Sequence, residues 1–254
     1  MISQFALSIV VGIFVGAIAG YLGSLMLTKR MALVGDALGH VALPGVGLAL
    51  LLGINISLMA FLFLAVGILL IWALEIKTSL PTEALVGVVF VTSLAIGFLI
   101  IPGADLEAAL IGDISQVSLA MAITSIVLCI FTFAVINKIY SGLILSSISP
   151  DLAEIEGVKA KKYNFIYLIL IAVVVALGIR VTGSLLVGAL VILPAATARN
   201  LSRNLKQYAY GSIFFGVISS VLGILLFKMT DLPAGPLIIL SAGFFFLISL
   251  LFKK

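Results

Sequence analysis

Two side chains that can bind a metal ion stand four residues apart in an otherwise apolar stretch of this 254-residue sequence. They are Asp36 and His40, and His40 is the only histidine in the chain. Residues four apart share one face of an α-helix. Carboxylate oxygen and imidazole nitrogen are both good ligands for first-row divalent metals. The pair therefore predicts a place where such an ion is handled.

Both residues are predicted to lie at the depth of a lipid bilayer. In a helix that starts at Met31, His40 lies about 13 Å along the axis, near the middle of a hydrocarbon core about 30 Å thick. An unpaired carboxylate at that depth is costly or takes up a proton, and a divalent cation removes the problem. Two structural alternatives stay open: Asp36 accepts a hydrogen bond from His40, or Asp36 caps a helix that begins at Ala37.

Two ligands make an incomplete site, and symmetry offers a way to complete it. In a twofold homodimer with this helix face on the axis, two carboxylates and two imidazoles meet and supply four ligands. Weak ligation suits a pathway, because an ion must leave as well as enter. Gly35 and Gly39 leave room for a close helix neighbour, and Pro44 is expected to bend the helix just beyond the pair.

The elements that must position this pair are membrane-spanning helices. The chain is 63% hydrophobic and 9% charged, and its mean hydropathy is +1.40. A soluble domain carries roughly 25% charged residues, and so small a protein has no core that hides this much apolar surface from water. The composition excludes a soluble enzyme, a nucleic-acid-binding module and a disordered chain. Long apolar runs predict an all-α polytopic membrane protein.

Runs of about 20 apolar residues predict about nine spans in a single membrane domain that covers residues 1–254. The sixth and seventh spans are short and are divided by Arg180 and Gly183, so one kinked helix or a re-entrant pair is an alternative there. No basic residue precedes the first run, so a cleaved signal peptide is not expected. The spans are expected near 5–27, 31–53, 56–75, 83–102, 117–137, 164–179, 183–199, 207–227 and 234–252.

Basic residues in the connections predict the orientation. With the N-terminus outside and nine spans, only Arg180 and Lys228 fall outside, and the C-terminus is cytoplasmic. The other basic residues lie in the cytoplasm, as the positive-inside rule requires. They are Lys29, Arg30, Lys77, Lys138, Lys159, Lys161, Lys162, Arg199, Arg203, Lys206, Lys253 and Lys254.

A polar segment between the fifth and sixth spans predicts a short cytoplasmic helix at about 149–158. A serine suits its N-cap, a proline suits its first turn, and two acidic residues suit the positive end of its dipole. A glycine can end it. The helix is either a solvated connector or a docking element for a cytoplasmic partner. The residues concerned are Ser149, Pro150, Asp151, Leu152, Ala153, Glu154 and Gly157.

The sequence contains no pattern for catalysis. A zinc protease of the HExxH type needs two histidines, and neither a Gly-x-Ser-x-Gly elbow nor a phosphate-binding loop is present. Any dependence on ATP must therefore come from a partner, and we expect no catalytic residue and no permanently bound cofactor. Glu75 and Glu83 flank a cytoplasmic loop with Lys77 and are expected to stay solvated.

Four segments resemble parts of the permease subunits of zinc, manganese and iron ABC importers, the ABC-3 family. They occur in the family's order and span nearly the whole chain. Gly39 departs from the pattern, since serine is common there, and so does the last segment at 234–236. The segments are RMALVGDALGHVALPGV (30–46), SPDLAEIEG (149–157), TGSLLVGALVILPAATA (182–198) and LPAGP (232–236).

The resemblance implies a type II ABC importer-like permease in a bacterial plasma membrane. It implies a homodimer, bound to two cytoplasmic ATP-binding subunits and supplied outside by a metal-binding protein. The 149–157 segment would be the coupling helix, and Asp36 and His40 would meet the ion, which is zinc or manganese, with iron(II) also compatible. The alternative is a self-sufficient secondary metal or proton transporter or a channel, which needs no ATPase.

Overall fold

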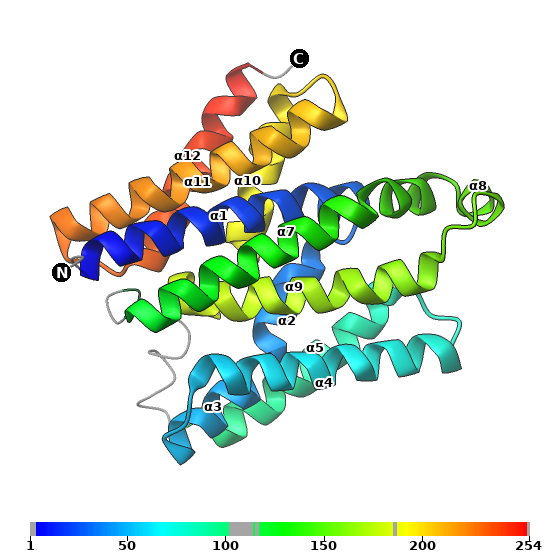
Figure 1. Ribbon diagram of the computed structural model, residues 1–254. Coiled ribbons are helices and arrows are strands. Elements are labelled where there is room, and N and C mark those ends of the chain that lie inside the picture. The colour runs from blue at the N-terminus through cyan, green and yellow to red at the C-terminus, as the bar shows by residue number, and fades with distance from the viewer. Residues whose placement is uncertain (1–3, 102–113, 115–116, 185–186, 253–254) are drawn as a thin grey trace.

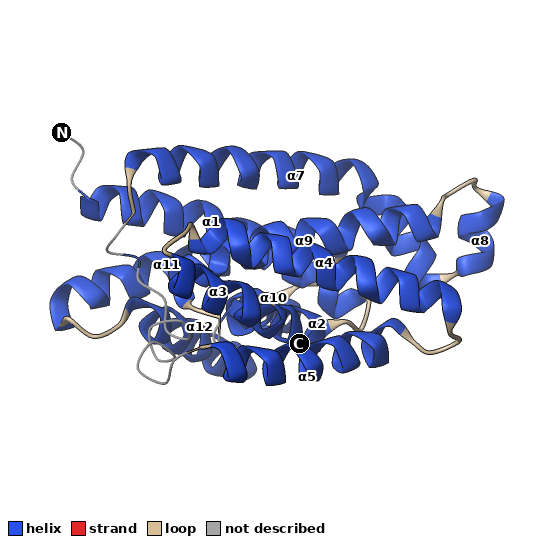
Figure 2. Cartoon of the chain, turned by 90° about the horizontal axis from the view of Figure 1, so that it is seen from below, coloured by secondary structure: helices blue, strands red, loops and turns tan. Residues whose placement is uncertain are grey.

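The computed structural model describes residues 4–101, 114, 117–184 and 187–252, and it is built from α-helices (Figures 1 and 2). This confirms the predicted all-α membrane fold. The helices are α1 (Gln4–Thr28), α2 (Ala32–Val41), α3 (Leu43–Leu52), α4 (Ile56–Lys77), α5 (Thr82–Ile100), α7 (Leu119–Ile148), α8 (Pro150–Ile155), α9 (Ala160–Thr182), α10 (Val187–Leu201), α11 (Leu205–Thr230) and α12 (Ala234–Leu251).

Eight helical stretches within the described ranges are long and apolar enough to cross a bilayer. Seven are single helices, and the other is Val34–Leu52, which runs through α2 and α3. The remaining predicted span, near 183–199, corresponds to α10. Its 15 residues rise only about 22 Å, less than a hydrocarbon core of about 30 Å. The predicted number of nine is therefore approximate: eight long passages and one short one.

The sixth predicted span is longer than the sequence indicated. α9 has 23 residues and continues past Arg180. It stops at Gly183, whose φ of 85° lies in the left-handed region that favours glycine. The chain then forms a separate helix, α10, so the alternative of one long kinked helix is wrong.

The two ends of the chain lie at opposite ends of the bundle. Phe5, near the start of α1, lies under the Lys228 ammonium near the end of α11, with 4.4 Å between the nitrogen and the ring centroid. Near the end of α10, which leads into α11, the amide of Asn200 donates a hydrogen bond of 2.9 Å to the hydroxyl of Ser249 near the end of α12. The chain therefore passes along the bundle an odd number of times, in agreement with eight long helices plus α10.

Close glycine contacts hold the first helix in place. α1 lies along α11, its most extensive neighbour (Figure 1). Gly16 and Gly216 face each other there, and a Cβ atom on either would overlap a backbone atom of the other. Small residues allow such close approach in a membrane, where apolar burial does not itself drive helices together.

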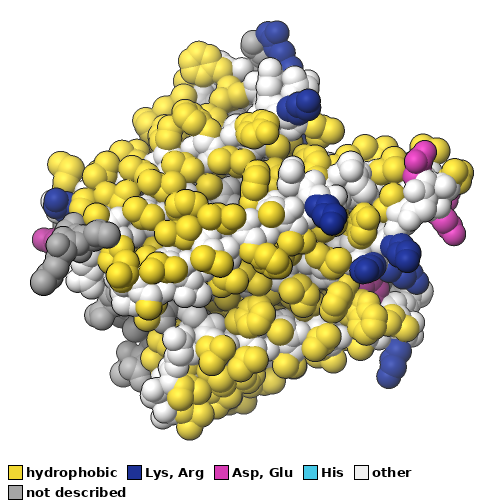
Figure 3. All heavy atoms as spheres, viewed as in Figure 1, with side chains coloured by type: hydrophobic (Ala, Val, Ile, Leu, Met, Phe, Trp, Pro, Cys, Tyr) yellow, Lys and Arg dark blue, Asp and Glu magenta, His cyan; other side chains and the backbone are white. Residues whose placement is uncertain are grey.

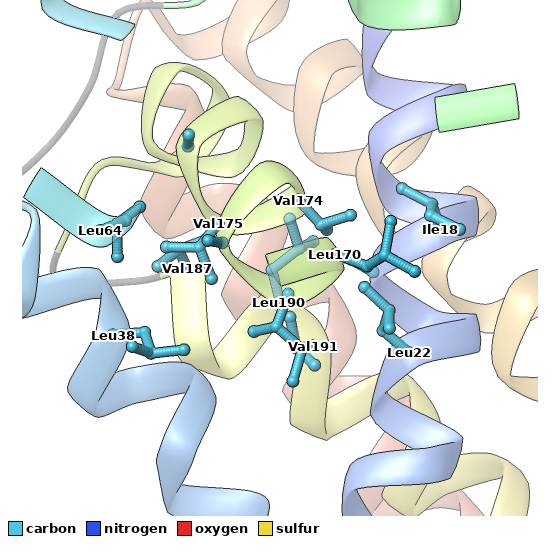
Figure 4. Close-up of a cluster of buried hydrophobic side chains, with 14 of the residues drawn as sticks. Ile18, Leu22, Leu38, Leu64, Leu170, Val174, Val175, Val187, Leu190 and Val191 are labelled. Atoms are coloured by element: carbon cyan, nitrogen blue, oxygen red, sulfur yellow. The ribbon is translucent and has the colours of Figure 1, made fainter. Parts of the chain in front are cut away.

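A buried apolar core joins α10 to its neighbours and so positions α2. Figure 4 shows side chains of α1, α2, α4 and α9 that surround α10. Leu38 of α2 belongs to this core and is fully buried, two residues from both Asp36 and His40. The labelled residues are Ile18, Leu22, Leu38, Leu64, Leu170, Val174, Val175, Val187, Leu190 and Val191.

The outer surface suits a lipid environment. Apolar side chains cover most of the face in Figure 3, and most of the Lys and Arg side chains on it lie toward the end that carries α8 and the C-terminus. Such asymmetry is expected of a multi-pass membrane protein, in which apolar side chains face lipid and basic side chains collect at one boundary.

Candidate functional site

Asp36 and His40 both lie on α2 and are partly buried. The helix begins at Ala32, so Asp36 is inside it and does not cap a helix at Ala37. That structural alternative is therefore wrong. The two side chains share one helix face, as their spacing predicts.

α10 brings a glycine directly against Asp36. A Cβ atom on Gly188 would lie 2.5 Å from the Cα and 2.6 Å from the Cβ of Asp36, so no side chain fits at that position. Gly39 also lies close to the start of α10. A Cβ atom on Gly39 would lie 2.7 Å from the carbonyl oxygen of Ser184 and 2.7 Å from a methyl group of Val187. The expected close helix neighbour of Gly39 is thus present. Gly188 is a positioning residue that the sequence analysis did not single out.

The helix is interrupted just beyond the pair. α2 ends at Val41 and α3 starts at Leu43, with Pro44 in its first turn. Proline has no N–H group, so Pro44 cannot donate a hydrogen bond to the carbonyl of His40 four residues earlier. The backbone oxygen of His40 therefore loses its usual helical donor and is approached by the Ala42 N–H instead.

The imidazole of His40 packs against α5 and has an unused nitrogen. Its ring lies 5.4 Å from the ring of Phe90, centroid to centroid, with 46° between the planes. Its Nδ1 atom is buried without a hydrogen-bond partner, so Nδ1 is not bonded to Asp36. Buried polar atoms rarely lack partners, and an unprotonated imidazole nitrogen is a common metal ligand.

A cavity of about 230 Å³ opens between α2 and α5 beside Asp36. Glu83, in the first turn of α5, lines the same cavity. Glu83 is exposed, as expected, but its place in the same cavity as Asp36 was not predicted. No local pattern signals it, because the contact depends on how two separate helices pack. The lining residues are Val34, Asp36, Ala37, Glu83, Val86, Gly87 and Phe90.

A second cavity, of about 450 Å³, lies at the end of the bundle, and Glu83 lines this one as well. It gathers Lys29, Arg30 and Lys161 with Glu75, so residues predicted to be cytoplasmic lie together. The carboxylate of Glu75 accepts a hydrogen bond of 3.0 Å from the hydroxyl of Thr82. Burial lowers the pKa of the Lys29 ammonium, and Glu75 acts in the opposite direction.

One copy of the chain offers few metal ligands. Across the part of the chain that the structure describes, no group of three or more His, Cys, Asp or Glu side chains is placed to hold a metal ion. Asp36 and His40 supply two ligand types but not a closed site. The arrangement can therefore touch an ion but not retain it firmly.

The predicted cytoplasmic helix is present as α8, beyond the end of the bundle (Figures 1 and 2). The Ser149 hydroxyl accepts a hydrogen bond of 3.4 Å from the Leu152 N–H, as an N-cap should. Gly157 has a φ of 70° and follows the last turn. Ala153 is buried, whereas Leu152 is 53% and Ile155 80% exposed. The exposed apolar pair includes Ile155, which the sequence analysis did not select.

Known proteins resemble this chain along nearly its whole length. Residues 1–253 match the model of the ABC 3 transport family. The high-affinity zinc uptake system membrane protein ZnuB of Haemophilus influenzae is 30% identical over 97% of this chain and 96% of its own. The manganese import system permease protein ScaB of Streptococcus gordonii is 31% identical over 95% and 88%.

A solved structure shares the fold. PsaBC from Streptococcus pneumoniae, in complex with Fab, superposes with a TM-score of 0.83 at 28% identity and covers 95% of this chain and 89% of that chain. The fold, the membrane-spanning helices and the sequence thus all indicate the same protein family. The chain belongs to the ABC 3 transport family and is a multi-pass membrane permease, not a catalytic subunit.

Proposed function

We propose that this permease takes up a divalent transition metal ion, zinc or manganese, along a path that includes Asp36 and His40. The observation that carries the proposal is the pair itself, on a helix held against Gly188, with an imidazole nitrogen that has no partner. The relatives ZnuB and ScaB are named for zinc and manganese. Both ions, and iron(II), accept the oxygen and nitrogen ligands of this pair.

A homodimer would complete the site. Two copies related by a twofold axis would place two carboxylates and two imidazoles around one ion. Each copy contributes only half of the ligands, so a relative movement of the two copies would open the site and release the ion. Transient coordination of this kind fits a transporter better than a permanent metal centre.

Glu83 is a candidate for the next carboxylate along the path. It lines both the cavity beside Asp36 and the larger cavity at the end of the bundle. An ion that leaves Asp36 would meet this exposed carboxylate before it reaches the basic residues at the rim. Glu83 therefore extends the proposed path beyond the two residues that the sequence indicated.

α8 is the candidate coupling helix for a cytoplasmic ATP-binding subunit. Leu152 and Ile155 are exposed on a helix that stands outside the bundle, where water would otherwise cover them. Exposed apolar side chains at such a place mark a protein contact. Ala153 is buried and anchors the helix to the permease. A transporter that works without an ATPase has no use for this element.

The basic residues at the end that bears α8 support an orientation of the chain in the membrane. Lys29, Arg30 and Lys161 line one cavity at the end that bears α8. The positive-inside rule assigns this end to the cytoplasm, together with the C-terminus. The opposite end, with the N-terminus and Lys228, would face outside and receive the ion from an external metal-binding protein.

Uptake by single-residue variants tests the proposal. We expect Asp36→Ala or His40→Ala to abolish uptake of radiolabelled zinc and manganese in cells that lack other importers. Assembly with the ATP-binding subunit, measured by co-purification, should stay intact because α8 is unchanged. Normal uptake by both variants would place the ion path elsewhere, and metal transport by the permease alone in liposomes would favour a self-sufficient transporter.

A further inference from the structure

A basic cavity of about 350 Å³ lies where the end of α1, the end of α10 and the start of α11 meet. Two guanidinium groups line it, and none of the described residues around it is acidic. Both guanidinium groups belong to exposed residues, so the cavity opens at the surface. The lining residues are Thr28, Arg199, Ser202, Arg203, Asn204, Leu205 and Tyr208.

The side chain of Tyr208 lies beside the guanidinium group of Arg199. The tyrosine side chain is only 6% exposed, and its hydroxyl is buried without a hydrogen-bond partner. A buried hydroxyl without a partner is unfavourable unless a ligand supplies one. Because Tyr208 lines the basic cavity next to Arg199, an acceptor oxygen bound at that guanidinium would also lie near this hydroxyl.

The start of α11 adds a further attraction for negative charge. Asn204 caps this 26-residue helix, and its side-chain oxygen accepts a hydrogen bond of 2.8 Å from the Gln207 N–H. The N-terminus of a helix carries partial positive charge. Two guanidinium groups, a helix N-terminus and a buried hydroxyl together match a phosphate group, which offers several charged acceptor oxygens.

A neighbouring cavity indicates which class of phosphate-containing ligand would fit. This cavity has about 390 Å³ and shares Ser202 and Arg203 with the first. The rest of its lining is mostly apolar and includes Ala198, Leu201 and Phe215. A ligand that fills both cavities must be charged at one end and apolar at the other, which describes a phospholipid but not a free phosphate ion.

The surroundings of the two cavities are also those of a lipid site. Leu205 lines the basic cavity and is 47% exposed, and Phe214, which is 57% exposed, packs against Phe215 of the neighbouring cavity. Basic pockets at the boundary of a membrane attract anionic headgroups. The charge of the basic cavity and the apolar lining of its neighbour therefore both suit an anionic lipid.

We propose that the two cavities bind an anionic phospholipid. Its phosphate lies between Arg199, Arg203 and the Tyr208 hydroxyl, and an acyl chain follows α11 past Phe215. The site is separate from the Asp36 and His40 path and does not depend on metal transport. Its physical role is to tie the turn between α10 and α11 to the membrane at the same end as α8.

Lipid titration of the purified full-length chain tests this site. Native mass spectrometry in detergent would measure the binding of phosphatidylglycerol, with phosphatidylcholine as the uncharged-headgroup comparison. The combined variant Arg199→Gln and Arg203→Gln should weaken phosphatidylglycerol binding about tenfold or more, because hydrogen bonds to a charged group are lost. Tyr208→Phe should weaken it less. Lys206→Gln removes one charge from the same turn but lines neither cavity, so it should bind like the parent.

Three results would overturn the proposal. Equal binding of both lipids, or equal loss in Lys206→Gln, would show that general charge and not this site decides binding. Inorganic phosphate that displaces phosphatidylglycerol at equal concentration would indicate a free-anion site. Loss of the preference when the permease is purified with its ATP-binding subunit would show that a subunit contact occupies the cavities. Unchanged melting temperatures would confirm that all variants fold.

Discussion

Asp36 and Glu83 illustrate how one cavity can give two carboxylates different tasks. Asp36 is partly buried against α10, whereas Glu83 is exposed and borders the basic end of the bundle. An ion at the first would be enclosed by packed helices, and one at the second would be close to water. We therefore propose that Asp36 meets the ion within the membrane and that Glu83 meets it on the way out.

Replacement of Glu83 tests that division of tasks. Glu83→Gln keeps the size of the side chain and removes the charge, so we expect the rate of metal uptake to fall about tenfold, the scale of one charged hydrogen bond. Glu75→Gln is the matched control, because Glu75 lines only the outer cavity and not the one with Asp36. Equal uptake by the parent and Glu83→Gln would remove Glu83 from the path.

Gly188 packs directly against Asp36, so its replacement should displace the Asp36 side chain. The added methyl group of Gly188→Ala would overlap Asp36, so α2 and α10 must separate at a cost of about 1–3 kcal/mol. We expect a lower melting temperature and reduced metal uptake. Gly243→Ala on α12, where a Cβ atom meets nothing within 4 Å, is the control. A Gly188→Ala permease with parental melting temperature and uptake would show that this contact is unimportant.

At the scale of elements, α8 is the helix that we propose contacts the ATP-binding subunit. A charge at its most exposed apolar position, Ile155→Asp, should prevent co-purification of the ATP-binding subunit because the buried contact would contain an uncompensated charge. Met229→Asp is a suitable comparison, since Met229 is 82% exposed near the opposite end of the bundle. Retention of the ATP-binding subunit by Ile155→Asp would contradict the coupling role.

Elements whose ends have local signals were predicted well. Ser149 and Gly157 bracket α8, and Pro44 marks the interruption between α2 and α3, because caps and proline act on their own neighbourhood. The sequence analysis divided the sixth and seventh spans at Arg180 and Gly183, and in the structure the break falls at Gly183 alone. A single charged residue does not stop a helix, whereas Gly183 does so through its backbone conformation.

Contacts between distant helices could not be predicted from one sequence. Gly188 against Asp36 and the cavity shared by Asp36 and Glu83 arise from the packing of α2, α5 and α10. The apolar runs that identify these helices carry no information on which faces meet. Candidate ligands were therefore found by residue type and depth, while the residues that place them became visible only in the fold.

At the scale of the whole molecule, the orientation in the membrane can be tested by labelling. Cys129 is buried and is the only cysteine, so Cys129→Ala gives a background without thiols. A thiol reagent that cannot cross membranes should label Asp231→Cys in intact cells and Glu156→Cys only after the cells are opened. The reverse pattern would invert the proposed orientation and the roles of the two ends.

The location of a bound metal ion tests the central claim most directly. Crystals of the assembled transporter soaked with manganese would give an anomalous-scattering map that shows where the ion resides. We predict a peak between the carboxylate of Asp36 and the imidazole of His40, shared by the two copies of the permease. A peak inside the membrane region that touches neither residue would contradict the account.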